Sequence, residues 1–188
     1  MLGSTVYRNS LSPSLEPLSS NFYTLPSLIM PGTTHVLATS FNRPSPSYLR
    51  RTFASVSNLL VIQDDSKTTF AHQIGDQHLT PIQSPLQSDE DLWHYLFLKP
   101  NTGIQHAKLT LLRSPAGLRV IIAGSNLGEQ WSVDRDVFWC QDFPHLPPGV
   151  RPASPKRKSN TFQEDLVAFL RHFNLSTSTT SDNRYGWS

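Results

Sequence analysis

The sequence predicts one α/β domain, a mixed β-sheet flanked by helices. Two strand-like segments with a helical pattern between them occupy residues 34–62, which is the spacing of a βαβ unit. Two apolar runs around a short turn over residues 106–123 predict a β-hairpin. An amphipathic helical pattern follows over residues 161–173. Strands and helices that succeed one another in this way favour a sheet with helices packed on it.

The composition allows a core and excludes several classes of protein. Apolar residues make up 37% of the 188 positions, charged residues make up 16%, and the formal net charge is +2. This balance excludes charge-driven disorder and a uniformly basic nucleic-acid coat protein. The one cysteine, Cys140, excludes an internal disulfide and a zinc site made of paired cysteines. No apolar run reaches the ~18–20 residues that span a bilayer, and no secretory signal is evident, so no membrane association is expected.

The chain is expected to have a lead-in, a domain and a tail. Residues 1–32 are rich in serine, proline and leucine, and proline every few residues blocks a long helix or a central strand. This segment is therefore expected to be irregular, with room for one short helix. The domain is expected over residues 33–174, and a polar tail over residues 175–188.

The first part of the domain contains the predicted βαβ unit. Residues 34–41 have the β-branched content of a strand. Prolines that follow this segment are expected to end the strand. Residues 47–53 suit a helix, with Leu49 and Phe53 four apart on one side. Residues 58–62 form a short apolar run that is typical of a strand buried on both faces.

The second part contains the predicted hairpin. Residues 64–91 are polar and are expected to be a surface connection, after which residues 92–98 resume a strand pattern. The hairpin strands are expected over residues 106–112 and 118–123, around a turn rich in proline and glycine. We expect this hairpin at the centre of the domain.

A proline-rich loop over residues 143–160 precedes the last helix and carries the basic run Lys156-Arg157-Lys158. The run is a nuclear import signal, a phosphate-contacting patch or a solvated charge run. Asn160 or Thr161 is expected to cap the helix, which has acidic residues in its first turn.

Three tryptophans and the cysteine are expected in the core rather than in a site. Trp93, Trp131 and Trp139 lie in apolar patterns. Cys140, next to Trp139, is expected to be a small buried hydrophobic residue rather than a nucleophile.

The candidate site comes from the hairpin. In a strand, residues two apart project to the same side, so His106 and Lys108 point together. The second strand is followed by Gly124-Ser125-Asn126, and in a regular hairpin Asn126 returns close to His106. An imidazole, an ammonium and an amide suit a phosphodiester, as nucleophile, charge clamp and neutral hydrogen-bond donor. On the pattern alone, an exposed pair on a strand is the more common case.

These residues resemble a known motif. His106-Ala107-Lys108 followed by Gly124-Ser125-Asn126-Leu127 is similar to the first active-site motif of the tyrosyl-DNA phosphodiesterases, a branch of the phospholipase D superfamily. Asn126 lies 18 residues after Lys108, as in that family. The similarity covers roughly residues 20–174 and is most specific over residues 103–139. It implies a phospholipase D-like half-domain.

The resemblance also implies a mechanism. His106 is then the nucleophile that forms a covalent phosphohistidine and releases a tyrosine or another adduct from a DNA 3′ end. Lys108 and Asn126 bind the non-bridging phosphate oxygens, and Gly103 and Ser125 contact the substrate. A second histidine, from the other half of the protein, protonates the leaving group and later activates water. No metal and no cofactor are required, and the implied setting is DNA repair in the nucleus.

Several positions depart from the family pattern. Arg113 replaces the aspartate that phospholipase-like members carry five residues after the lysine, which favours DNA ends over lipids. Thr102 and Gln105 replace a DNA-stacking aromatic residue and a second histidine, so the resemblance does not extend to base stacking there. Asp136 lies where the family places a polar residue that orients the partner histidine, and it is either that acid or an exposed loop residue.

One half of the family's site is absent from the sequence. The family assembles its active site from two half-domains, each with a histidine, a lysine and an asparagine, but this sequence contains one His-x-Lys. Three explanations stay open: the chain is a fragment, a homodimer completes the site by symmetry, or the chain is an inactive remnant. We expect a 3′-phosphodiesterase half-site, with DNA 3′ ends and the missing half as partners. The alternative is a catalytically silent nucleic-acid-binding module.

Overall fold

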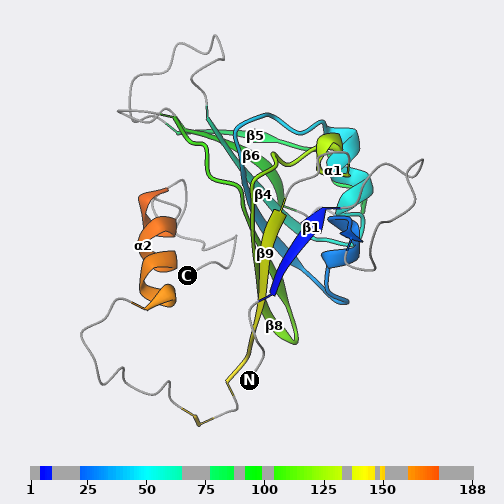
Figure 1. Ribbon diagram of the computed structural model, residues 1–188. Coiled ribbons are helices and arrows are strands. Elements are labelled where there is room, and N and C mark those ends of the chain that lie inside the picture. Colours follow the sequence, from blue (N-terminus) through cyan, green and yellow to red (C-terminus); the bar gives the residue numbers. More distant parts are fainter. Residues whose placement is uncertain are drawn as a thin grey trace. The chain divides into compact units, whose positions relative to one another are not determined.

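The computed structural model of the chain is built on a mixed β-sheet (Figure 1). The structure describes residues 5–9, 22–64, 77–86, 92–98, 104–132, 137–146, 149–150 and 161–173. The chain divides into two compact units, Met1–Pro144 and His145–Ser188, and each is described by itself. This division falls within the predicted domain 33–174, whose limits stay a prediction, and the predicted tail 175–188 lies outside the described residues.

The first unit contains the sheet, whose described strands number nine. They are β1 (Thr5–Asn9), β2 (Phe22–Tyr23), β3 (His35–Ser40), β4 (Asn58–Asp64), β5 (Gln77–Pro81), β6 (Leu92–Leu98), β7 (Leu109–Ser114), β8 (Gly117–Ala123) and β9 (Val137–Pro144). Their order across the sheet is β2-β1-β9-β8-β7-β3-β4-β6-β5. Strands β3, β4 and β6 are parallel, whereas β7, β8 and β9 continue the sheet beyond β3 in antiparallel pairs. The predicted mixed α/β fold is confirmed.

Helix α1 (Pro46–Thr52) joins the parallel strands β3 and β4 and completes the predicted βαβ unit. The Ser45 hydroxyl caps the helix by accepting a hydrogen bond from the N–H of Tyr48 at 3.1 Å. A proline occupies the first helical position, where an N–H would have no partner. Leu49 and Phe53 anchor the helix, since both side chains are fully buried. Strand β4 is buried on both faces, as its apolar run predicts.

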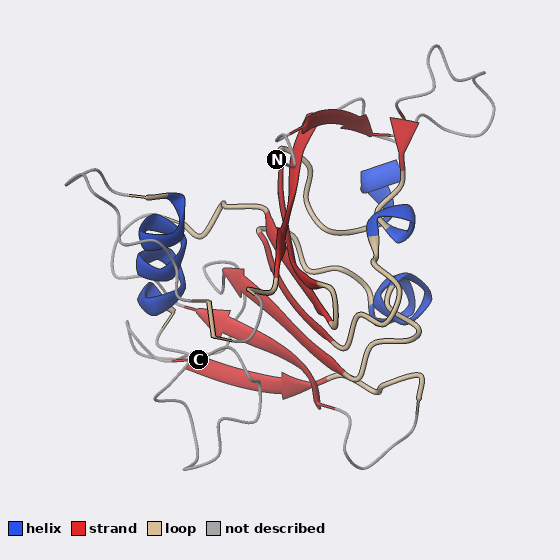
Figure 2. Cartoon of the chain, turned by 90° about the horizontal axis from the view of Figure 1, so that it is seen from below, coloured by secondary structure: helices blue, strands red, loops and turns tan. Residues whose placement is uncertain are grey.

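One face of the sheet carries the main core. Helix α1 and the short 3-10 helix η1 (Pro26–Leu28) both lie on this face (Figures 1 and 2). Alternate strand residues pack toward them, such as Val36 and Ala38 of β3. Trp93 of β6 is 1% exposed, and its indole N–H donates to the Val56 carbonyl at 2.9 Å. The indole nitrogen therefore has a partner although the ring is buried.

The predicted core residues divide by strand alternation. Trp93, Trp131 and Cys140 are buried, which confirms their prediction. Trp139 is only partly buried. It lies in β9 between Phe138 and Cys140, which both face the core, so its side chain points to the opposite face.

The predicted hairpin is β7–β8, and it occupies the middle of the sheet. Ser114 and Gly117 pair across its turn. Gly117 has a φ of +137°, and a Cβ there would lie 2.3 Å from the Phe143 carbonyl oxygen of β9. Only glycine fits this close approach. The predicted start of the first strand at residue 106 is wrong, because ladder pairing begins at Leu109.

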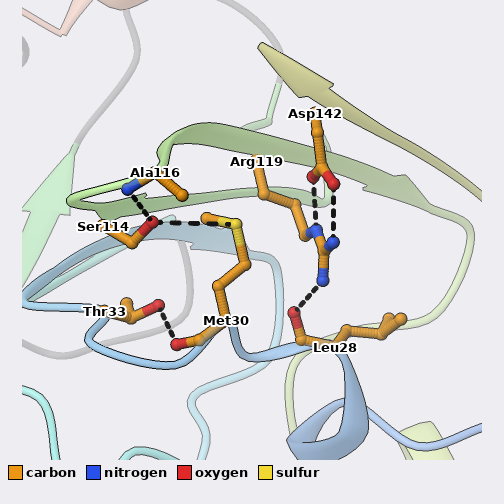
Figure 3. A network of polar contacts seen from close by, with 7 residues as sticks. All are labelled: Leu28, Met30, Thr33, Ser114, Ala116, Arg119 and Asp142. Carbon is orange, nitrogen blue, oxygen red and sulfur yellow. Dashed lines mark hydrogen bonds and ion pairs between the residues drawn. The ribbon is translucent and has the colours of Figure 1, made fainter. Parts of the chain in front are cut away.

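Arg119 of β8 ties the sheet to the segment that precedes β3 (Figure 3). Its guanidinium forms a two-pronged ion pair with the Asp142 carboxylate of β9, with N–O distances of 2.6 and 2.7 Å. Its remaining nitrogen donates to the Leu28 carbonyl at 2.8 Å. The hydrogen bond from Arg119 lowers the pKa of Asp142. The ion pair thus joins two neighbouring strands and the end of η1 at one point.

Two predicted loops contain strands at the margins of the sheet. The prediction of irregular structure over residues 1–32 is wrong for β1 and β2, although η1 is a short helix in that segment. The predicted surface connection over residues 64–91 contains β5, which pairs with β6. Strands β2 and β5 are the outermost strands of the sheet. Each pairs with one neighbouring strand only, β2 with β1 and β5 with β6. Pro81 ends β5, and an edge strand tolerates proline.

The second unit is described chiefly by helix α2 (Phe162–His172). Thr161 and Glu164 form a capping box: each side chain accepts a hydrogen bond from the other residue's N–H, at 3.2 and 2.8 Å. Thr161, rather than Asn160, is therefore the N-cap. The run Lys156-Arg157-Lys158 lies outside the described residues. Neither described α-helix has the length and hydropathy needed to cross a bilayer.

Replacing Gly117 with alanine is expected to destabilise the protein strongly. The new Cβ would collide with the β9 backbone, and φ at this position disfavours any L side chain. We expect Gly117→Ala to lower the free energy of unfolding by about 2–4 kcal/mol in urea titrations. Gly128→Ala is the matched control, because no atom lies within 4 Å of its added Cβ. Equal losses in the two variants would contradict this account.

Removing the charge of Asp142 is expected to lower the free energy of unfolding at neutral pH but not in acid. The Arg119 partner lowers the folded-state pKa of Asp142, so its contribution is present near neutral pH and is lost as pH falls through that pKa. The pair is partly exposed, so we expect Asp142→Asn to cost about 0.5–1 kcal/mol at pH 7. Urea unfolding at pH 7 and at pH 2.5 should show the two proteins converge in acid. A difference that persists or grows at low pH would exclude the charge as its source.

Candidate active site

The loops that leave β3, β4 and β8 and the segment that enters β7 lie at one edge of the sheet. Ala38 near the end of β3 pairs with Thr110 at the start of β7, and Leu109 pairs with Ile122 near the end of β8. This carboxyl edge of parallel strands is where open α/β sheets bind ligands. The predicted catalytic residues all adjoin these strand ends: His106, Lys108 and Asn126.

His106 and Lys108 lie in the extended segment before β7, and their side chains meet. The Lys108 ammonium is 2.5 Å from Nδ1 and 3.4 Å from Nε2 of His106. Because an ammonium only donates hydrogen bonds, Nδ1 carries the lone pair and the proton of a neutral ring is on Nε2. His106 is exposed and Lys108 is partly buried. The imidazole is therefore accessible to solvent.

Phe41 connects His106 with Asn126. Its ring lies against the imidazole of His106, with centroids 4.9 Å apart and planes inclined by 36°. Its backbone N–H donates to Oδ1 of Asn126 at 3.1 Å, and the N–H of Asn42 approaches the same oxygen at 3.5 Å. Phe41 was not predicted as a site residue. The signal for it in the sequence was an aromatic residue at the end of the strand predicted over residues 34–41.

The contacts of Asn126 determine which way its amide points. Backbone N–H groups only donate, so the side-chain atom that faces Phe41 and Asn42 must be the oxygen. The NH₂ group then points away from the backbone of this loop. A partly buried amide oriented in this way offers donors to an anionic oxygen without adding a charge.

Thr39 holds the segment that carries His106 and Lys108. Its hydroxyl donates to the carbonyl of Ala107 at 2.7 Å and accepts from the N–H of Leu109 at 2.9 Å. Thr39 is 2% exposed, so no solvent replaces these hydrogen bonds. The hydroxyl thus takes the place of a backbone partner where β3 and β7 part, which explains why the strand begins later than predicted.

Asp64, at the end of β4, holds the same segment at a residue that precedes His106. Its buried carboxylate accepts a hydrogen bond from the N–H of Gln105 at 2.5 Å. Gln105 directly precedes His106, so the backbone on both sides of the imidazole is anchored by side chains of neighbouring parallel strands. Asp64 was not predicted as a site residue, since its partner lies 41 positions away.

Ser40 and Gln63 hold the loop that positions Asn126. The Ser40 hydroxyl donates to the Asn42 carbonyl at 2.8 Å and accepts from the N–H of Leu127 at 3.1 Å. The Gln63 amide donates to the same Asn42 carbonyl at 3.0 Å. Both side chains are buried. The β3 and β8 loops are therefore fastened to each other and to β4.

The remaining predicted site residues are only partly described. Ser125 is 5% exposed and directly precedes Asn126, and its role in substrate binding stays a prediction. Gly103 and Asp136 lie outside the described residues, as does Thr102. Among the residues that the structure describes, no group of three or more histidine, cysteine or acidic side chains is placed to hold a metal ion.

Comparison with known proteins identifies the family. The tyrosyl-DNA phosphodiesterase family model matches residues 49–184, well over half of the chain. The chain belongs to the tyrosyl-DNA phosphodiesterase family. No individual curated protein matches the sequence. The match includes the His106-Ala107-Lys108 segment and Asn126, so the family resemblance inferred from that motif is confirmed.

Solved structures of this family have the same fold. The yeast tyrosyl-DNA phosphodiesterase superposes with a TM-score of 0.61 at 14% identity, over 92% of this chain and 38% of the yeast chain. A single-residue mutant of the yeast enzyme gives a TM-score of 0.62 at 14% identity, with the same coverage. The chain thus spans 38% of the length of these relatives. The fold expected from the family resemblance is confirmed.

Replacing Thr39 with valine is expected to release the segment before β7. Valine has the shape of threonine but leaves the Ala107 carbonyl and the buried Leu109 N–H without their partner. We expect Thr39→Val to lower the free energy of unfolding by about 2 kcal/mol. Thr39→Ser, which keeps the hydroxyl, should cost less in the same urea titration. A larger loss for serine than for valine would show that the methyl group, not the hydroxyl, matters.

Proposed function

We propose that this chain supplies the first half of an active site that hydrolyses 3′-phosphodiester adducts on DNA, including 3′-phosphotyrosyl bonds, in DNA repair. The observation that carries the proposal is the contact of the Lys108 ammonium with the His106 imidazole at the sheet edge that also carries Asn126. Membership in the tyrosyl-DNA phosphodiesterase family supports this chemistry. DNA repair makes the nucleus the proposed location.

His106 is the proposed nucleophile. An imidazole nitrogen attacks phosphorus, a bond from nitrogen to phosphorus forms, and the bond from phosphorus to the tyrosyl oxygen breaks. The phenolate leaves with a proton supplied by an acid of the other half-site. Water then attacks the phosphohistidine, which frees His106 and leaves a 3′-phosphate on the DNA. The Phe41 ring limits rotation of the imidazole and so favours one angle of attack.

Lys108 and Asn126 are the proposed phosphate-binding groups. The ammonium and the amide NH₂ stabilise the charge that builds on the non-bridging oxygens as the nitrogen attacks. In the free protein the ammonium contacts Nδ1. Its transfer to a phosphate oxygen frees the lone pair of the imidazole for the reaction. Gly103 and Ser125 remain proposed substrate contacts, and Asp136 the proposed orienting acid for the partner histidine.

A second half-site completes the proposed enzyme. The chain spans 38% of the yeast enzyme, and its sequence has one His-x-Lys, which supports a site made of two halves. The second half is a further part of a longer protein or a second copy of this chain. The competing proposal is a silent module that keeps the phosphate-binding residues and binds nucleic acid without turnover. The two proposals differ in whether a phosphohistidine forms.

Incubation with a 5′-labelled oligonucleotide that ends in 3′-phosphotyrosine tests the proposal. In excess EDTA, the active half-site is expected to release tyrosine or to accumulate a covalent adduct on His106. His106→Ala should abolish both, and Lys108→Ala should lower the rate about 10²–10³-fold. His145→Ala, at an exposed position in the unit that does not contain the sheet, is the control and should leave the rate unchanged. Binding without adduct or release, both by this chain and by a longer protein that contains it, would favour the silent module.

A further inference from the structure

Arg43 is an exposed residue of the loop that follows β3, beside the candidate site. Its guanidinium carbon lies 4.6 Å from the ring centroid of Tyr95 and 5.4 Å from that of Phe97. Both rings belong to β6 and are at most 2% exposed. They form a fixed aromatic support under one face of the guanidinium.

The backbone on both sides of Arg43 is fixed as well. The Asn42 carbonyl accepts hydrogen bonds from the side chains of Ser40 and Gln63. The Pro44 carbonyl accepts a hydrogen bond from the hydroxyl of Tyr95 at 2.7 Å. A surface arginine usually loses considerable side-chain freedom when it binds a ligand. Arg43 has lost part of that freedom in advance, which favours binding.

Arg43 directly follows two residues that contact the proposed catalytic groups. Phe41 lies against His106, Asn42 donates to Asn126, and Arg43 follows directly. Among the residues that the structure describes, Arg43 pairs with no carboxylate, whereas Arg51 and Arg119 each have an acidic partner. Arg43 therefore adds a positive charge at this edge that forms no ion pair with a described acidic residue.

We propose that Arg43 binds a phosphate of the DNA strand that adjoins the scissile phosphodiester. The inference rests on the proposed function, which places DNA at this edge. The aromatic support occupies one face of the guanidinium, and the Tyr95 hydroxyl is also a hydrogen-bonding neighbour of it. The remaining N–H groups of this exposed side chain are the ones proposed to bind two oxygens of one phosphate. A phosphate contact of this kind positions the strand and does not depend on its sequence. Arg43 is thus a binding residue of the substrate and not a participant in the bond changes.

Binding of two single-stranded oligonucleotides to the 188-residue chain tests this role. One oligonucleotide ends in a 3′-phosphate and the other in 3′-phosphotyrosine, and fluorescence anisotropy is measured over a range of salt concentrations. Arg43→Gln is expected to weaken both complexes about tenfold. It should also reduce the slope of log K against log salt by about 0.7, the value for one phosphate contact on a single strand.

Arg113→Ala is the matched control, because it removes the same charge from an exposed position at the opposite edge of the sheet. It should leave the affinity and the salt slope almost unchanged. If Arg43→Gln does not fold, as judged by circular dichroism, Arg43→Lys replaces it. The lysine variant should keep the slope and lose several-fold in affinity, because an ammonium cannot make the two-pronged contact.

Three results would overturn the inference. Wild-type affinity in Arg43→Gln excludes a phosphate contact, and wild-type affinity in Arg43→Lys, when that variant is used, excludes the two-pronged contact on which the inference depends. A loss confined to the phosphotyrosyl oligonucleotide, with an unchanged slope, assigns Arg43 to the adduct instead. Absence of binding by the wild-type chain overturns the proposed function together with the inference. Binding without cleavage, with the expected Arg43 effect, supports the inference and removes only the catalytic proposal.

Discussion

Where β3 and β7 separate, the hydroxyl of Thr39 takes over both hydrogen bonds that a backbone partner would have made. The Ala107 carbonyl and the Leu109 N–H that it binds lie on either side of Lys108. Residues 104–107 lie outside the ladder, and at Lys108 the carbonyl still accepts a hydrogen bond from the N–H of Ala123 in β8 at 3.0 Å. The hydroxyl, buried at 2% exposure, keeps that segment attached to the sheet. Without it, the backbone on either side of Lys108 would lose two of the hydrogen bonds that position the imidazole and the ammonium.

The same arrangement recurs along this edge of the sheet. Ser40, Gln63 and Asp64 are buried polar residues at the ends of β3 and β4, and each binds backbone of a loop that reaches the site. Burying a polar side chain is costly unless it is hydrogen-bonded, so these groups strongly favour the loop geometry that satisfies them. The result is a candidate site whose imidazole is exposed while the polar residues that hold its loops are buried. Such rigidity suits chemistry that depends on the angle of attack at phosphorus.

The opposite edge of the sheet is held differently. There, an ion pair between neighbouring strands and a glycine turn pressed against β9 join β8 and β9, and the third guanidinium bond reaches the end of η1. These contacts concern structure, and none of their groups is placed to act on a phosphate. The two ends of the strands differ in this way because β3, β4 and β6 are parallel. The carboxyl ends of these strands lie on one side of the sheet, and the loops on that side carry the candidate site residues.

Much of this protein follows from its sequence alone. Local patterns predict the βαβ unit, the central hairpin and the capped last helix, because the periodicity and the cap residues that specify them are contiguous. The His-x-Lys spacing and the later Asn126 predict the family and the candidate catalytic groups, because short motifs survive in linear order.

The tertiary structure alone decided the rest. Strands β1, β2 and β5 form because a neighbouring strand offers a free edge, which a proline-rich or polar segment does not reveal about itself. Phe41, Arg43 and Asp64 reach the site because β3, β4 and β6 end at one edge, and their partners lie far away in the sequence. Hydrogen bonds between distant residues leave no local pattern, so the supports of the site became visible only when the strands were placed side by side.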